Sequence, residues 1–587
     1  MTNRRRSLVV ALCGSTAIVV SACTAVPDTG PVHAGQQAEP IAGRHVQVDP
    51  RKPVPGSTPD LIVSGFRFAN SDTSEALGVA KAYLVDGASW QPQGVVVVAD
   101  SGSSPVDTTS GDTTTVKIVD TQVGQIAADG TYQPLPAGRQ VPYSYGLVKD
   151  LKEGGEWRIT NAPATLVLTV SQIEASYQLG YVYFLRPDEQ MLVPVQVFLP
   201  VSRGKLAEAL LTTLLHGPPD WLKPAVVTAI PSIITAPGPT QSNNVTTVDL
   251  SQRAASLSLS QRNAIAAQIS FTLANLATPL QDFGDLRILA GETPLINDPR
   301  LAVQTAADWT SFDPDALKTD FYYSDLGHQT RDHRGELVAG DTGVLNVTNL
   351  LAPVVAPRTA AAGASDLIAG VVQSATGTQA LYAGPLLAPK KLLSGSSFTT
   401  PSWDSLGNLW TVQQQSSTSA PKVRIAPSGR ATLPGTVAAP DLANKVIEEL
   451  RVSRDGTRVA VLTLSTNVTQ VLVGVVAKDG TTIEHFYPVA PALTSVIDVV
   501  WASSTTLDIL STSPNSNDAE TSSHLWSVDI DGWAPSLIEQ GVLATADSIA
   551  AAPHEPVVIG TSTSEIDVYE NNQWVFVGNG ESPHYPG

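Results

Sequence analysis

The sequence predicts a multidomain protein in which two α+β modules precede an all-β propeller of about six blades. The chain of 587 residues is too long for one hydrophobic core. Only 15% of its residues are charged, whereas Gly (44) and Pro (43) are abundant, which favours a β-rich protein with many turns. Two turn signals in the last half of the chain recur with one period of roughly 50 residues, as expected for propeller blades.

The first 22 residues are typical of an export signal. Arg4, Arg5 and Arg6 precede an apolar run over residues 8–20. A helix that crosses a bilayer needs about 20 apolar residues, so this run is too short to span and suits the core of a signal peptide. The run ends at Val20-Ser21-Ala22-Cys23.

This tetrapeptide resembles the lipobox of bacterial lipoproteins. The resemblance implies that a peptidase cuts between Ala22 and Cys23 and that the Cys23 sulfur carries a diacylglyceryl group. Two or more acyl chains hold a protein stably on a membrane. The alternative is ordinary cleavage after an A-x-A-like site, with Cys23 incidental.

The cysteine count and the charge limit the function further. Cys13 leaves with the signal and Cys23 would carry lipid, so we expect no internal disulfide in the mature chain. The formal net charge of -19 argues against nucleic acid as a partner and against electrostatic docking on anionic lipid.

Residues 23–59 are rich in Pro, Gly and Gln and predict a tether with polyproline character.

Residues 60–172 predict a small α+β module. Its helix is expected over "SEALGVAKAYL", where Leu77, Ala80, Lys81 and Leu84 keep helical spacing. A helix followed by a curved sheet that ends in "EWRI" resembles nuclear transport factor-like and cystatin-like modules.

Residues 175–295 predict a second α+β module. It begins with the hairpin "YVYFLRPDEQMLVPVQVFL" and continues with an amphipathic helix that ends at Gly217. A second helix is expected over "SQRNAIAAQISFTLANL" with Ser260 as its N-cap, before the closing strand "DLRILAG". The order "VYF", "LVPV", "LLHGPP", "TAIP", "VTTVDLS", "QISFTL", "LRILAG" resembles the GerMN domain of spore-germination proteins. The resemblance implies an extracytoplasmic binding module without a known catalytic centre.

Residues 310–587 carry the repeat. "LRVSRDGTRVAVL", "VVWASSTTLDIL" and "IAAAPHEPVVIG" align on Gly456, Thr505 and Glu555, and a second phase recurs at Gly429, Gly480 and Gly532. Two turn signals with one period predict blades of four antiparallel strands. Five to seven blades fit, and six are favoured; the alternative is a pair of β-sandwiches.

Candidate metal ligands gather once in the sequence, at Asp325, His328, Asp332 and His333. Histidine and carboxylate are competent ligands, but this spacing matches no zinc pattern. The segment lies between two predicted domains, so we interpret it as a solvated polar loop and expect no metal.

Catalytic motifs are not apparent. The chain lacks a G-x-S-x-G elbow for a nucleophilic serine. Asp529 and Asp531 could suggest the paired acids of a glycosidase, but they lie at a repeated hairpin position where the turn itself explains them. Most of seven tryptophans that could line a sugar-binding face fall in predicted strands, which favours core packing: Trp157, Trp221, Trp403, Trp410, Trp501, Trp526 and Trp574. We predict no catalytic residues and no cofactor.

Lipobox, Pro-rich tether, α+β module, GerMN-like module and propeller, with the ending "GNGESPHYPG", together resemble the LpqB lipoprotein family of actinobacteria. The resemblance implies a non-enzymatic lipoprotein on the outer face of the cytoplasmic membrane. It also implies binding to the extracellular domain of the MtrB sensor histidine kinase, with effects on two-component signalling, cell-wall and division homeostasis. Two alternatives remain open: a binder of cell-wall glycan or peptide, and a hydrolase that uses the propeller channel.

Overall fold

The computed structural model describes residues 50–587 except 73–76, 89, 91, 93, 103–104, 275–284, 317–318, 326–329, 337–349, 358–366, 386–387, 415–418, 428–433, 467, 513–522, 534 and 543–544. Cys13, Ala22, Cys23 and most of the predicted tether therefore lie outside the described residues. Within the described part of the chain, no helix has the length and apolar character that a membrane span requires.

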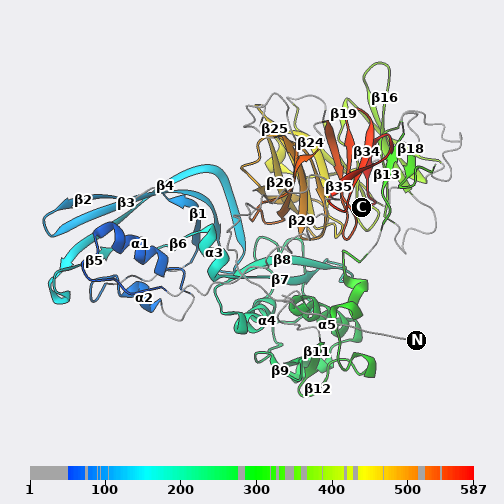
Figure 1. Ribbon diagram of the computed structural model, residues 1–587. Coiled ribbons are helices and arrows are strands. Elements are labelled where there is room, and N and C mark those ends of the chain that lie inside the picture. The colour runs from blue at the N-terminus through cyan, green and yellow to red at the C-terminus, as the bar shows by residue number, and fades with distance from the viewer. Residues whose placement is uncertain are drawn as a thin grey trace, which may run out of the picture. The chain divides into compact units, whose positions relative to one another are not determined.

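The N-terminal domain is a curved sheet covered by helix on one face (Figure 1). Its strand order is β5-β4-β3-β1-β6, with β2 paired to β3. Helix α1 (Pro59–Ala69) packs Ile62, Val63 and Phe66 into the same core as Val116 and Tyr145 of the sheet. The strands are β1 (Val96–Gly102), β2 (Val106–Ser110), β3 (Thr113–Ile126), β4 (Tyr132–Asp150), β5 (Glu156–Asn161) and β6 (Val167–Thr169).

The helix expected over "SEALGVAKAYL" is wrong in extent. Helix α2 covers only Gly78–Lys81, and Leu77 before it has left-handed backbone with φ 48°. The main helix is α1, at the end of the predicted tether, where Pro59 occupies the first turn and Asp60 follows it. Proline and an acidic residue in the first turn are ordinary helix-start signals, so the sequence held the evidence for α1.

The middle domain contains the predicted hairpin and both predicted helices. The hairpin is β7 (Gln178–Leu185) with β8 (Leu192–Leu199), and every residue of β8 is buried. Helix α4 (Leu206–His216) ends at Gly217 as predicted. Helix α5 covers Leu259–Ala274 and so begins one residue before the expected segment. The predicted N-cap, Ser260, is wrong, because the Ser258 hydroxyl accepts the Gln261 N–H at 3.2 Å. Helix α3 (Val170–Ser176) precedes the hairpin and contacts β1 and β6 of the N-terminal domain. The remaining strands are β9 (Thr240–Ser242), β10 (Val245–Leu250), β11 (Asp285–Ala290) and β12 (Thr293–Pro294), with sheet order β12-β11-β10-β9.

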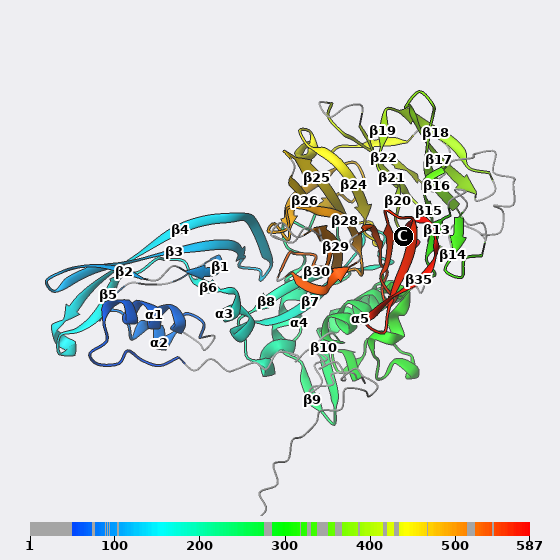
Figure 2. The same ribbon diagram turned by 45° about the horizontal axis from the view of Figure 1, so that its top comes forward.

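The described residues of the C-terminal domain form six separate sheets, which confirms a propeller of about six blades. Figure 2 shows these sheets arranged around one axis. Five have a run of four antiparallel strands. They are β15 (Leu350–Val355), β16 (Leu367–Gln373), β17 (Gln379–Pro385) and β18 (Lys390–Gly395); β19 (Ser397–Phe398), β20 (Ser402–Trp403), β21 (Leu409–Gln414), β22 (Lys422–Ala426) and β23 (Gly435–Val437); β24 (Val446–Val452), β25 (Arg458–Ser465), β26 (Val468–Val476) and β27 (Ile483–Val489); β28 (Val496–Trp501), β29 (Thr506–Thr512), β30 (Ser523–Asp529) and β31 (Ser536–Val542); β32 (Ala546–Ala550), β33 (Val558–Thr561), β34 (Glu565–Glu570) and β35 (Gln573–Asn579).

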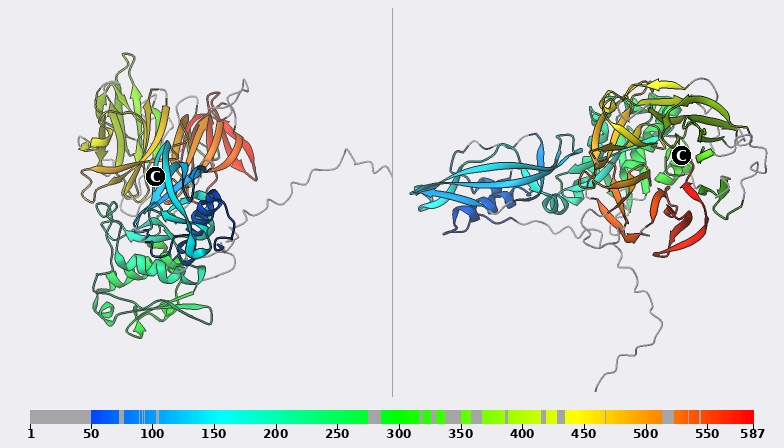
Figure 3. Two further views of the ribbon diagram at one scale, coloured as in Figure 1. Left: turned by 90° about the vertical axis from the view of Figure 1, so that its left-hand side faces the viewer. Right: turned by 90° about the horizontal axis from the view of Figure 1, so that it is seen from above.

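The sixth sheet closes the ring. It has the order β14-β13-β36, so β36 (Glu581–His584) pairs with β13 (Tyr322–Ser324), which is followed by β14 (Thr330–Asp332). The inner strands of the blades contact each other in a circle, β15, β20, β24, β28, β32 and β36, and β36 contacts β15 again. Figure 3 shows the blades from two further sides. The prediction that residues 325–333 form a solvated connecting loop is therefore wrong in part, because β14 is a blade strand.

Short 3-10 helices connect several of these elements. They are η1 (Leu151–Glu153), η2 (Arg203–Lys205), η3 (Gln252–Ser256), η4 (Pro299–Leu301), η5 (Ala306–Phe312) and η7 (Pro440–Leu442).

Candidate functional site at the mouth of the propeller channel

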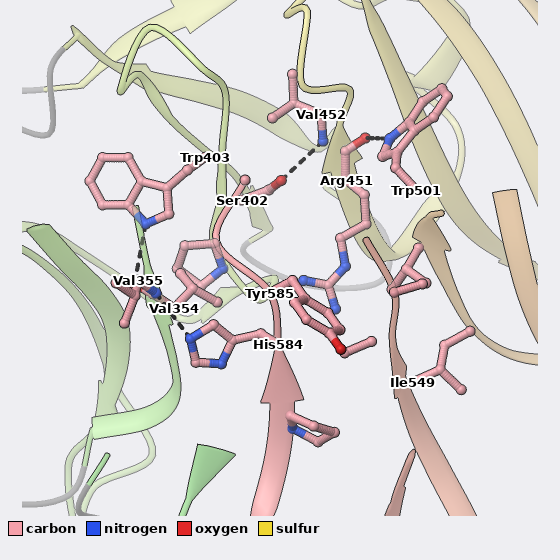
Figure 4. Close-up of a pocket in the computed structure, with 16 residues that line it drawn as sticks. Val354, Val355, Ser402, Trp403, Arg451, Val452, Trp501, Ile549, His584 and Tyr585 are labelled. Atoms are coloured by element: carbon pink, nitrogen blue, oxygen red, sulfur yellow. Dashed lines mark hydrogen bonds between the residues drawn. The ribbon is translucent and has the colours of Figure 1, made fainter. Parts of the chain in front are cut away.

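The inner strands of the propeller surround a small axial cavity of about 50 Å³ (Figure 4). Trp403, Arg451, Trp501, His584 and Tyr585 line it, one or two from each of several blades. Aromatic and aliphatic side chains fill most of the axis, so little free space is left between the blades.

Hydrogen bonds between neighbouring blades hold these residues in place (Figure 4). Trp403 Nε1 donates to the Val354 carbonyl at 3.2 Å, and Trp501 Nε1 donates to the Arg451 carbonyl at 3.0 Å. Val452 N–H donates to the Ser402 hydroxyl at 3.0 Å. Each bond joins one inner strand to the next, so these residues hold neighbouring blades together along the axis.

His584 is a buried titratable group on the propeller axis. Its Nε2 accepts the Val355 backbone N–H at 3.1 Å. Burial, and to a smaller extent the nearby Arg451, lowers the pKa of His584 to about 4, although the Ser582 carbonyl opposes this. The neutral imidazole of His584 already uses its lone pair to accept a hydrogen bond. It therefore serves to join β36 to β15 and not to transfer protons.

A wider cavity of about 260 Å³ forms one mouth of the channel. Three carboxylates line this cavity, and they are equally spaced along the sequence: Glu449, Asp498 and Asp547. Thr400 also lines it and precedes Glu449 by the same number of residues. The pairing register of each of the three inner strands shifts beside its carboxylate. The blade repeat therefore carries three acidic side chains to one end of the axis.

The charges at this mouth lie close together. Glu449 and Asp498 are buried, and Arg451 forms an ion pair with Glu449 and lies 3.9 Å from an Asp498 oxygen. Burial raises the pKa of the Glu449 carboxyl well above its usual range, Arg451 opposes this, and Asp498 adds to it. Asp547 is more exposed, but partial loss of solvent around its carboxyl, together with the charge of Asp498, raises its pKa.

Asp498 also has a structural task. Its Oδ1 accepts the N–H of Val499 at 2.7 Å, and its Oδ2 accepts the N–H of Ile549, in the next inner strand, at 2.8 Å. This carboxylate thus joins β28 to β32. The arrangement can receive a cationic group at the mouth, but both Asp498 oxygens are already engaged.

The metal-ligand candidates of the sequence do not converge. His328 lies outside the described residues. Asp325 forms an ion pair with Arg331 at 2.8 Å, and His333 lies 3.4 Å from Asp320. Asp332 Oδ1 accepts the N–H groups of Arg334 and Glu336 in a turn. No group of three or more His, Cys, Asp or Glu side chains is placed to hold a metal ion among the residues the structure describes.

The turn explanation of Asp529 and Asp531 is incomplete. Asp531 Oδ1 does accept the Trp533 N–H at 2.9 Å within the turn. Asp529, however, accepts a hydrogen bond at 2.9 Å from Gln196 Nε2 of the middle domain. These two residues therefore lie where two domains meet, which the repeat pattern alone did not reveal.

The tryptophans mostly pack as predicted. Trp403 and Trp410 are among the largest fully buried side chains, and Trp501 is buried beside the axis. Trp157 lies on β5 with the Lys149 ammonium 5.5 Å from its ring centre. The carboxylates at the channel mouth were missed in the sequence, although their constant interval was visible there.

A second large cavity, of about 580 Å³, lies in the N-terminal domain beside Lys52, Lys81, Trp90 and Arg158. Arg158 lies 3.4 Å from Glu153, and Lys152 lies 3.7 Å from Asp86. Its charges of both signs favour neither an anionic nor a cationic ligand.

Comparisons with known proteins agree with this architecture. Residues 52–174 match the family model "Lipoprotein LpqB, N-terminal domain", residues 181–294 match "Sporulation and spore germination", and residues 335–586 match "Lipoprotein LpqB beta-propeller domain".

Relatives that match over the whole chain extend the likeness. The chain is 29% identical to Lipoprotein LpqB of Thermobifida fusca, covering 100% of this chain and 99% of the relative. It is 26% identical to Lipoprotein LpqB of Streptomyces avermitilis, with coverage of 100% and 99%. Among solved structures it is similar to the β-propeller domain of the Trilobed protease from Pyrococcus furiosus, with 8% identity, a TM-score of 0.26, and coverage of 39% of this chain and 72% of that one.

Proposed function

Because the chain belongs to the LpqB family of lipoproteins, we propose that it is a lipid-anchored, non-enzymatic accessory protein of a membrane sensor histidine kinase of the MtrB type. It acts on the outer face of the cytoplasmic membrane, where it binds the kinase's extracellular domain and modulates signalling for cell-wall and division homeostasis. The single observation that carries the proposal is the full-length likeness to LpqB lipoproteins, which keeps the N-terminal domain, the germination-type domain and the propeller in one order.

The anchor supports this role through effective concentration. A lipidated Cys23 followed by a Pro-rich tether would keep the folded domains within a thin layer above the membrane. Short flexible linkers give effective concentrations of the order of mM, so a free-solution Kd of about 0.1 mM would suffice for binding in that layer.

The test is a binding titration between the lipid-free chain and the purified extracellular domain of the kinase. We expect saturable binding with a Kd at or below about 0.1 mM. The control is the same chain heated until the propeller unfolds. Absence of saturable binding at that concentration, with a cooperative melting transition still present, would refute kinase binding.

The carboxylates at the channel mouth favour a second candidate, a hydrolase with Glu449 as acid. An acid of raised pKa beside a second carboxylate is the pattern that glycosidases use. We would incubate the chain and its Glu449→Gln variant with purified peptidoglycan. Release of soluble fragments by the parent chain, but not by the Glu449→Gln variant, would support the hydrolase. If the parent and the variant both sediment with undigested peptidoglycan, the result would support a wall-binding protein.

A further inference from the structure

The turn around Gly532 brings side chains of all three domains together. Trp533 is buried, and its ring lies 5.0 Å from Tyr132 of the N-terminal domain and 4.6 Å from Phe198 of the middle domain. Phe198 N–H in turn donates to the Gly130 carbonyl at 2.8 Å. One propeller residue thus contacts the aromatic cores of two other domains.

Polar groups next to this aromatic contact cross the same boundary. Arg458 is 1% exposed, and its Nη2 donates to the Pro194 carbonyl of β8 at 2.7 Å. Gln196, also on β8, donates to Asp529. We call Arg458, Gln196, Asp529 and Asp531 the polar seam.

The polar seam is not fully satisfied. Arg458 Nε and Nη1, Gln196 Oε1 and Asp531 Oδ2 are buried without a hydrogen-bond partner. A buried polar atom without a partner costs about 1–3 kcal/mol. Two of these atoms are donors on Arg458, and two are acceptors, Gln196 Oε1 and Asp531 Oδ2. Such a seam is poised to change its hydrogen bonds, because a proton on one carboxyl adds a donor next to unused acceptors.

We propose that the polar seam is a proton-dependent latch between the middle domain and the propeller. The latch holds the middle domain on the propeller while the Asp529–Asp531 pair keeps a proton, and it lets the two domains separate when both carboxyls ionise. Arg458 faces Asp531 and also lies 4.0 Å from the buried Asp455. Because the carboxylates outnumber this guanidinium, each proton lost from the Asp529–Asp531 pair adds a negative charge to a buried contact.

The groups that face the two carboxyls come from every neighbouring element. They are Gln196 and Tyr181 of the middle domain, Tyr132 of the N-terminal domain, and Arg458 and Tyr487 of the preceding blade. Asp455, buried 4.0 Å from Arg458, shares that cation.

The direction of the pH effect follows from burial. Burial raises the pKa of Asp529 and, together with the charge of Asp529, that of Asp531. In the separated state both carboxyls return to ordinary values of about 4. Closure therefore binds protons, is fully favoured below about pH 4, and weakens as the pH rises through the raised values. Each pKa unit gained by one carboxyl on closure changes the closing equilibrium tenfold.

The test measures the distance between the two domains directly. In the full chain with Cys13→Ser and Cys23→Ser, new cysteines at the exposed positions Ile233 and Val468 accept a donor and an acceptor dye. We expect energy transfer to fall between pH 5 and pH 9, with the ratio of closed to open molecules decreasing at least about tenfold. In the Asp529→Asn, Asp531→Asn double variant, whose amides mimic the neutral acids, transfer should stay high at pH 9.

The matched control is Asp479→Asn. Asp479 lies at the equivalent turn of the preceding blade, but it is exposed, so this variant should follow the parent. Trp533→Ala should lower transfer at every pH, because the aromatic contact is lost. Transfer that is constant from pH 5 to 9 in the parent, or a double variant that follows the parent, would overturn the latch. Circular dichroism at both pH values verifies that the domains stay folded.

Discussion

Replacement of Tyr585 by alanine should open the propeller at its closure. Tyr585 follows β36, is buried, and packs against Phe321, whose ring centre lies 5.9 Å away. Its hydroxyl donates to the Pro556 carbonyl at 2.8 Å. Removal of a large buried aromatic ring costs about 3–5 kcal/mol. For a domain of this size each kcal/mol lowers the melting temperature by about 2–4 °C, so we expect a decrease of roughly 6–20 °C.

Differential scanning calorimetry on the full chain measures this effect. Tyr585→Phe separates the ring from the hydroxyl and should cost only about 0.5–1.5 kcal/mol, because one hydrogen bond is lost. Phe576→Ala is the control, since Phe576 on β35 is 54% exposed and its loss should stay within about 0.5 kcal/mol. If Tyr585→Ala melted together with the Phe576 control, ring closure would not depend on this contact, and the reasoning would be wrong.

Three further predictions concern the anchor and the channel. Cys23→Ala should leave an uncleaved precursor that takes up no radiolabelled palmitate in cells; normal labelling would contradict the lipobox. Because burial lowers the pKa of His584 to about 4, stability should fall as the pH decreases from about 6.5 towards 4, and His584→Gln should reduce that slope in melting experiments; an unchanged slope would argue against it. Arg451→Ala leaves the buried Glu449 and Asp498 without their cation and should destabilise the propeller by about 3–5 kcal/mol in calorimetry; an unchanged melting temperature would show that the pair holds a proton instead.

The fold was predictable where the sequence pattern is local. Leucines at helical spacing followed by Gly217 predicted α4, and recurrent turns at Gly456, Gly480 and Gly532 predicted the blades. Helix α1 was missed because the Pro-rich composition before it favoured a longer tether. The pairing of β13 with β36 joins segments far apart in the chain, and no local pattern reports such pairing.

The site was less predictable, for a related physical reason. Asp529 and Asp531 have the residue types of an ordinary turn, and only the approach of Gln196 from another domain changes their environment. Burial of a carboxylate depends on such distant neighbours. Glu449, Asp498 and Asp547 were accessible to inspection, because a polar residue at a fixed place in each repeat indicates one end of the propeller axis.

The pairing of β13 with β36 has a mechanical consequence. The chain that leaves the middle domain enters the propeller at β13, so any tension along that connection loads the β13–β36 pair before it reaches a complete blade. These short strands share few backbone hydrogen bonds, and the five larger sheets would stay intact after they part. A pull on the connection would therefore separate β13 from β36 first, at one defined place in the ring.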